Sequence, residues 1–139
     1  MDLTLIFFLA GIIIIGAVLF ALMSFGKKGV KHLNVEQFRV KYLEIENQLD
    51  KEKSTTFYMT IMNGDKLVDQ ALRDLGVKGE TMGDRMRNAA TRFKDREGIW
   101  KAHKLRNRVA HDTDIVVQYH EARYALVCYK KALKDLGAI

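Results

Sequence analysis

An uninterrupted apolar run near the N-terminus restricts what this chain can fold into more than any other feature. From position 3 to position 25 the sequence reads LTLIFFLAGIIIIGAVLFALMSF, which is 23 residues without a charge. About 20 apolar residues in a helix span the ~30 Å hydrocarbon core of a bilayer. The run therefore predicts a retained transmembrane anchor over residues 1–26.

A cleaved signal peptide is the competing interpretation of the same run. Such a peptide has a positively charged start and then an apolar stretch of about 7–15 residues. Here only Met1 and Asp2 come before the run, which is longer than that and lacks the basic start. Ser24 to Gly26 forms an acceptable small-x-small cleavage site, so cleavage stays open as an alternative.

The charges beside the run predict its orientation. Asp2 comes before it, and Lys27, Lys28 and Lys31 come directly after it. Positively charged flanks stay in the cytoplasm. We therefore expect a single-pass protein of the plasma (inner) membrane, with its N-terminus outside and its C-terminal domain in the cytoplasm.

The residues after the anchor are typical of an all-α fold. The 139-residue chain has no proline and one cysteine. Without proline there are few forced helix breaks, and a single cysteine excludes an internal disulfide or a multi-cysteine metal site. No segment alternates as a strand would. We expect a cytoplasmic bundle of four to five helices over residues 54–139, joined to the anchor by a juxtamembrane helix or stalk over residues 27–53.

Apolar residues at helical spacing place the individual helices. The first is expected from about Asn34 to Glu52, either as a stalk, as a coiled coil or as the first helix of the bundle. A second begins at a Ser54 or Thr55 cap and ends at Gly76. The third covers residues 82–93, with a break at 95–98, and the fourth covers residues 99–109. The last helix is expected to start at caps within residues 112–114 and to end at residue 137.

The net charge of +6 is concentrated in two segments. Residues 27–41 carry a net charge of +4, which membrane topology and anionic lipid headgroups explain. Residues 84–108 carry +6, and topology does not require that cluster. It predicts a phosphate-binding surface, although a solvated helix face is the plainer alternative. The expected RNA- or phosphate-binding residues are Lys101, Lys104, Arg108 and Arg92.

Three polar residues within this cluster share one helix face. His103, Asn107 and His111 follow each other at intervals of four. The two histidines are eight residues apart, about 12 Å along a helix, which is too far to share a metal ion. We therefore expect no metal and no cofactor. His103 is expected to be an exposed or hydrogen-bonded polar residue, with membership of the polar stripe in the cleft as the alternative.

The stretch LRNRVAHD carries a family resemblance. Arg106, Asn107 and His111 fit the R-N-x-x-x-H form of the R-x4–6-H motif, and the stretch resembles the signature of HEPN domains. HEPN domains are small helical bundles found in many prokaryotic proteins, and the resemblance covers roughly residues 54–137. It implies a metal-independent endoribonuclease of the toxin or defence type. It also implies a homodimer in which two motifs form one cleft, with any regulator on a separate chain.

The chemistry of the motif residues agrees with that implication. Metal-free RNA cleavage by the 2′-hydroxyl needs a base, an acid and positive charge on the phosphorus centre. Histidine is suited to the proton transfers, and the arginine fork is suited to the phosphate. We therefore expect Arg106, His111 and Asn107 to be the catalytic residues, with Asn107 orienting His111 or the phosphate. A single His111 cannot be both acid and base in one turnover, which favours a dimer.

Two alternatives assign these residues no catalysis. Some HEPN-like domains have the bundle without nuclease activity, which would make this chain a membrane-tethered binding or scaffold module. In a purely structural interpretation, His111 caps the end of its helix, and Arg106 pairs with a carboxylate such as Asp112 or Glu121.

Overall fold

The computed structural model describes residues 2–26 and 32–139, with side chains described from 2 to 22 and from 32 onward. The basic flank formed by Lys27, Lys28 and Lys31, on which the predicted orientation rests, lies outside the described residues. These residues divide into a unit that contains helix α1 and a compact unit, His32–Ile139. In the described part of the chain every regular element is helical, which confirms the all-α prediction.

Helix α1 is the apolar run. It extends over Leu3–Gly26, and its segment Leu3–Leu22 is long and apolar enough to cross a membrane. None of that segment is buried within the chain. A signal sequence meets the same criteria of length and composition.

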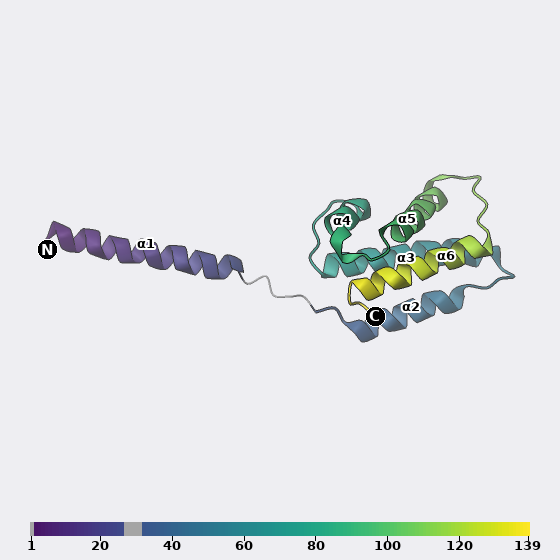
Figure 1. Cartoon of the computed structure of the whole chain (residues 1–139), viewed down its shortest axis with the longest axis horizontal. Helices are drawn as coiled ribbons and strands as arrows, with labels where there is room; N and C mark the ends of the chain where they lie inside the picture. The colour runs from purple at the N-terminus through teal and green to yellow at the C-terminus, as the bar shows by residue number, and fades with distance from the viewer. Residues whose placement is uncertain (1, 27–31) are drawn as a thin grey trace. The chain divides into compact units, whose positions relative to one another are not determined.

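The compact unit contains five α-helices and one short 3-10 helix among its described residues (Figure 1). The elements are α2 (Val35–Gln48), α3 (Ser54–Asp74), α4 (Met82–Asn88), η1 (Ala90–Arg92), α5 (Arg96–His111) and α6 (Tyr119–Asp135). Helices α3, α5 and α6 contact one another, and α2 and α4 pack against α3. Figure 1 shows α3 and α6 side by side, with α2 and α5 next to them.

Helix α2 packs as the first helix of the bundle. Phe38, Tyr42 and Ile45 on one face are buried in the common core. The Tyr42 hydroxyl donates a hydrogen bond to the Leu126 carbonyl of α6 at 3.0 Å. Of the alternatives open for this segment, the observed packing is that of a bundle helix.

Helix α3 is the central element, and one glycine sets its distance from α6. Gly64 lies against the ring of Tyr129, so closely that a Cβ at this position would come within 2.4 Å of Tyr129 Cδ2. Tyr129 is fully buried, and its hydroxyl donates to the Ala102 carbonyl of α5 at 3.2 Å. This side chain therefore ties the three core helices together.

Several predicted helix ends are confirmed. The Asn34 side chain accepts the Gln37 N–H at 3.1 Å and caps α2. Gly76 and Gly137 follow the ends of α3 and α6 with φ of 75° and 73°, a left-handed conformation that glycine adopts without a Cβ penalty.

Cys128 is buried in the core, as a packed thiol would be.

Other predicted ends are wrong. Lys53, not Ser54 or Thr55, is the N-cap of α3. Helix α5 begins at Arg96, so the predicted break over residues 95–98 falls within its first turn. Helix α2 ends at Gln48, four residues before the predicted end.

The last helix shows the largest difference. It starts at Tyr119, after the N-cap Gln118, and the predicted caps within residues 112–114 lie in the preceding loop. The physical reason is a tertiary contact. The Tyr58 hydroxyl donates to the Ile115 carbonyl at 3.1 Å and accepts the Val117 N–H at 3.4 Å, which holds this segment extended on α3.

Candidate functional site

A solvent-open cavity of about 840 Å³ lies between α3, α4 and α5. The three motif residues Arg106, Asn107 and His111 all contribute to its lining, together with Lys104. Helix α5 brings them there because residues 103, 107 and 111 share one face, with position 106 beside it. The Arg106 side chain is 32% exposed and His111 is exposed, so both remain accessible to a ligand.

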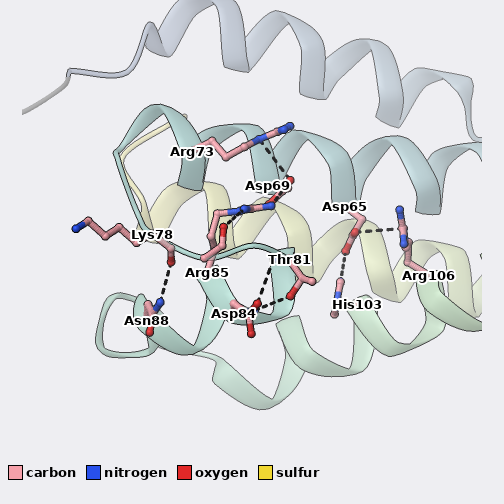
Figure 2. A network of polar contacts seen from close by, with 11 residues as sticks. Asp65, Asp69, Arg73, Lys78, Thr81, Asp84, Arg85, Asn88, His103 and Arg106 are labelled. Atoms are coloured by element: carbon pink, nitrogen blue, oxygen red, sulfur yellow. Dashed lines mark hydrogen bonds and ion pairs between the residues drawn. The ribbon is translucent and has the colours of Figure 1, made fainter.

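Four side chains form a closed ring of polar contacts on one wall of this cavity, which we call the Asp65 ring: Asp65, His103, Asn107 and Arg106. His103 Nδ1 lies 2.9 Å from Asp65 Oδ1, and His103 Nε2 lies 3.3 Å from the Asn107 amide nitrogen. Arg106 Nη1 donates to Asn107 Oδ1 at 3.1 Å, and Arg106 Nε lies 3.4 Å from Asp65 Oδ2. Figure 2 shows Asp65 between His103 and Arg106.

Hydrogen-bond chemistry assigns the donors in the ring. A carboxylate accepts, so His103 donates from Nδ1 to Asp65 and leaves Nε2 as an acceptor for the Asn107 amide. The Arg106 Nε–H is buried without hydrogen-bond geometry, although its distance to Asp65 is that of an ion pair. Arg106 is therefore held by charge on Asp65 and by one hydrogen bond to Asn107.

Asp65 is the least accessible charged residue of the cavity wall, with 3% of its surface exposed. Desolvation by burial raises the pKa of its carboxyl, and the hydrogen bond from His103 and the charges of His103 and Arg106 oppose that rise. A buried carboxylate left unpaired is strongly destabilising. The ring supplies the partners that make its burial tolerable.

A second ion pair, one helical turn further along α3, fixes the opposite wall. Arg85 of α4 donates from Nε and Nη2 to the two oxygens of Asp69 at 2.7 and 3.1 Å, and from Nη1 to the Gly79 carbonyl at 2.6 Å. A Cβ at Gly79 would come within 2.7 Å of the Arg85 backbone nitrogen. Figure 2 shows Arg85 and Asp69 in contact, beside Asp65, His103 and Arg106. The contacts of Arg85 hold α4 and the loop before it against α3.

Two lysines give the cavity a positive rim. Lys66 and Lys104 line it with exposed side chains, and neither has a carboxylate within 4 Å among the described residues. By contrast, Arg87 in the same lining pairs with Asp84. The acidic residues of the lining, Asp65 and Asp69, are both paired with arginines. The cationic groups left without partners favour an anionic ligand.

The remaining predicted phosphate-binding residues lie elsewhere. Lys101 and Arg108 line a second hollow, between α5 and α6, which Lys104 also borders. Lys101 pairs with Glu97 at 2.7 Å, and Arg108 pairs with Asp112 at 3.7 Å. Arg92 lies on η1, outside the linings of both hollows.

Arg106 pairs with a carboxylate, as the structural interpretation expected, but that carboxylate is Asp65 of α3 and neither of the two examples, Asp112 and Glu121. Asp112 instead pairs with Arg108, one helical turn away. The carboxylate of Glu121 accepts the Gln118 N–H at 2.8 Å and caps α6.

Asp65 was not identified as a site residue from the sequence, and the burial of His103 was not predicted. His103 is hydrogen-bonded, as one of its two expected states requires, but it is buried, with 7% of its surface exposed. A signal for Asp65 exists in the sequence. It stands four residues after Ile61 and three before Val68, on the apolar stripe of its helix, where a carboxylate needs a buried partner.

Within the described residues, no group of three or more His, Cys, Asp or Glu side chains is placed to hold a metal ion. In the comparisons with known proteins, no protein-family model matches the sequence, and searches of curated proteins and of solved structures find no match.

Proposed function

We propose that this chain is a membrane-anchored, HEPN-like protein that binds RNA in the cavity between α3, α4 and α5 and cleaves it without a metal ion. In this proposal Arg106 binds the scissile phosphate, His111 transfers a proton and Asn107 orients the phosphate-binding group. Lys66 and Lys104 attract the RNA backbone.

One observation carries the proposal: Arg106, Asn107 and His111 line a single cavity that is open to solvent. A charged fork and an imidazole in one hollow supply the positive charge and one of the two proton-transfer groups that metal-free transfer at phosphorus needs. The lysines beside them favour a polyanion. RNA is the expected substrate because its 2′-hydroxyl supplies the nucleophile that the cavity residues do not.

The anchor gives the proposal a location. In our proposal α1 stays attached, crosses the plasma (inner) membrane and keeps His32–Ile139 in the cytoplasm, where RNA is present. Support comes from the length and apolar composition of α1 and from the lysines that follow it in the sequence.

The Asp65 ring favours one second candidate, a tethered module that binds RNA without cutting it. In the ring Arg106 and Asn107 already hold each other and Asp65, as structural residues do. The cavity would then serve as a binding surface for a phosphate backbone, with no proton transfer.

Incubating the purified full-length chain in detergent with single-stranded RNA and EDTA separates the two candidates. We expect the wild type to cleave the RNA and to leave 2′,3′-cyclic phosphate ends. His111→Ala should lower kcat/KM about 100-fold or more, which is the range of a lost proton-transfer group. Arg106→Ala should lower it comparably.

The control is Lys134→Ala, an exposed change on α6 outside the cavity lining, which should cleave like the wild type. A folded wild type that binds RNA but leaves it intact would contradict the nuclease proposal and favour the binding module. A wild type that neither binds nor cleaves would contradict both.

A further inference from the structure

We infer that His103, oriented by Asp65, is the second proton-transfer residue of the cavity, so that one chain holds both the base and the acid. The inference rests on the proposed function and extends it. The motif supplies one histidine per chain, and a second copy was expected to supply the other. The structure offers a source for it within the same cavity.

The first support is the orientation of the His103 ring. Asp65 Oδ1 accepts a hydrogen bond from the Nδ1–H of His103, with 2.9 Å between the heavy atoms, which fixes the neutral tautomer with its lone pair on Nε2. A buried carboxylate behind an imidazole also stabilises the imidazolium that forms when Nε2 takes a proton, as in hydrolytic triads. Asp65 is thus a positioning residue, and Nε2 is the reactive atom.

The second support is the accessibility of Nε2 from the cavity. His103 is in the cavity lining, and the only hydrogen bond that its Nε2 accepts within the described residues comes from the Asn107 amide at 3.3 Å. This distance is longer than a normal N–H···N or N–H···O contact. A substrate hydroxyl can take the place of that weak contact while Asn107 turns toward the phosphate.

The third support is the placement of the two histidines around the arginine. His103 and His111 are eight residues apart on α5, about 12 Å along the helix axis, and both line the same cavity. Arg106 and Asn107 lie between them. A phosphate held at Arg106 would lie between these two helix positions, and in-line transfer requires a proton-transfer group on the side of the 2′-oxygen and another on the side of the 5′-oxygen.

The reaction balances with these groups alone. His103 Nε2 takes the proton from the 2′-hydroxyl as that oxygen forms a bond to phosphorus. The bond from phosphorus to the 5′-oxygen breaks, and that oxygen takes a proton from protonated His111. The products are a 2′,3′-cyclic phosphate and a free 5′-hydroxyl. Proton exchange with water returns His103 to the neutral form and His111 to the charged form.

The test separates proton transfer from a merely structural role by the choice of variant. His103→Asn places an amide N–H where Nδ1 stands, so the bond to Asp65 can persist while Nε2 is lost. His103→Gln is the second variant, because its amide replaces the Nε2 end of the ring. His120→Gln is the matched control, since His120 is exposed and outside this cavity.

We expect a folded His103→Asn chain to lose activity about 100-fold or more, because it lacks the reactive Nε2. Added imidazole should restore part of the activity of His103→Ala, which a structural role would not allow. The inference is overturned if folded His103→Asn or His103→Gln keeps near-wild-type activity.

Mixing two inactive variants tests whether one chain is sufficient. A mixture of His103→Ala and His111→Ala chains should stay inactive, because each cavity lacks one group. Recovered activity would mean that the two histidines meet across copies, against the single-chain arrangement. If the wild type does not cleave RNA at all, the proposed function fails; if the wild type cleaves and His103→Asn matches it, only the present inference fails.

Discussion

Asp65 shows how a single side chain can organise a site without belonging to its motif. It is buried on α3 and contacts two residues of α5, one on each carboxylate oxygen. These contacts fix the direction of His103 and bring the Arg106 guanidinium to the cavity wall. Replacing Asp65 would therefore leave the motif intact in sequence and disturb it in space.

Gly64, the residue before Asp65, determines how closely α3 and α6 approach. Gly64→Ala should lower the free energy of unfolding by up to about 2 kcal/mol, because the steric cost of overpacking, about 1–3 kcal/mol, is offset by a gain of only about 1 kcal/mol in helix propensity. The cause is the Tyr129 ring, 2.4 Å from the added Cβ. Chemical denaturation of the full-length chain measures the change.

Gly83→Ala is the matched control, because a Cβ at this helical glycine meets its nearest neighbours at an ordinary 3.7 Å. It should leave stability unchanged or slightly higher. A Gly64→Ala chain as stable as Gly83→Ala would show that Tyr129 shifts without cost and that the close approach is not required.

At the scale of the elements, α5 carries the site and needs a firm start. Asp95 accepts the Gly98 N–H at 2.8 Å as the N-cap, and Lys131 of α6 lies 3.3 Å from its other oxygen. The Gly98 hydrogen bond, with Lys131 next, holds the pKa of this carboxyl below its usual value. The start of α5 is thus joined to α6 by charge.

A pH dependence of stability follows from that lowered pKa. The stabilisation by the Asp95 carboxylate is fully present above its unfolded pKa and is lost as the pH falls through the lower folded pKa. Asp95→Asn keeps a capping oxygen and removes the charge. Its melting temperature should lie below that of the wild type at pH 7, and the difference should shrink as the pH falls.

The control is Glu52→Gln, since Glu52 is exposed and makes no ion pair among the described residues. Its melting temperature should parallel the wild-type value across the same pH range. An Asp95→Asn difference that stays constant with pH would exclude a contribution from the charge.

Helix interiors were predictable from spacing alone, whereas several ends were not. The stripe from Tyr119 to Leu133 on α6 is buried or partly buried as its periodicity required. The start of that helix was missed because Tyr58, far away in sequence, holds the loop before it. Local caps within residues 112–114 compete with this contact, and the tertiary contact prevails.

The site was predictable to the extent that it lies on one helix. Residues 106, 107 and 111 come together because of helical geometry, which spacing reveals. Asp65 and Asp69 join them from α3, and which turn of α3 faces α5 depends on the packing of Gly64 against Tyr129. Spacing within one helix carries no information about that register between helices.

For the whole molecule, the mean hydropathy hides two segments of different composition. The mean hydropathy of -0.13 suggests an ordinary polar chain. It combines a helix with no charged residue, α1, and a bundle, His32–Ile139, that holds 20 of the 23 Lys and Arg residues of the chain. Hydropathy and charge should therefore be considered separately for α1 and for the bundle.

Membrane topology is the property that tests this division. In cells whose outer envelope is permeabilised and whose plasma (inner) membrane is intact, an added protease should leave the bundle uncut. In lysates the same protease should digest the bundle. A C-terminal tag should remain in the membrane fraction on a chain of full length. Digestion from outside would contradict the proposed orientation, and a shortened, released chain would indicate cleavage after the apolar run.

The two carboxylates one turn apart on α3, Asp65 and Asp69, also have a consequence for how the sequence evolves. Asp69 holds the α4 wall through Arg85, and Asp65 holds the α5 wall through Arg106 and His103. A homologue without Asp65 would leave Arg106 without its counter-charge and His103 without its hydrogen-bond acceptor. Selection would then favour substitutions at positions 103 and 106 too. Among homologues, the residues at positions 65, 103 and 106 are therefore expected to covary with one another, independently of those at positions 69 and 85.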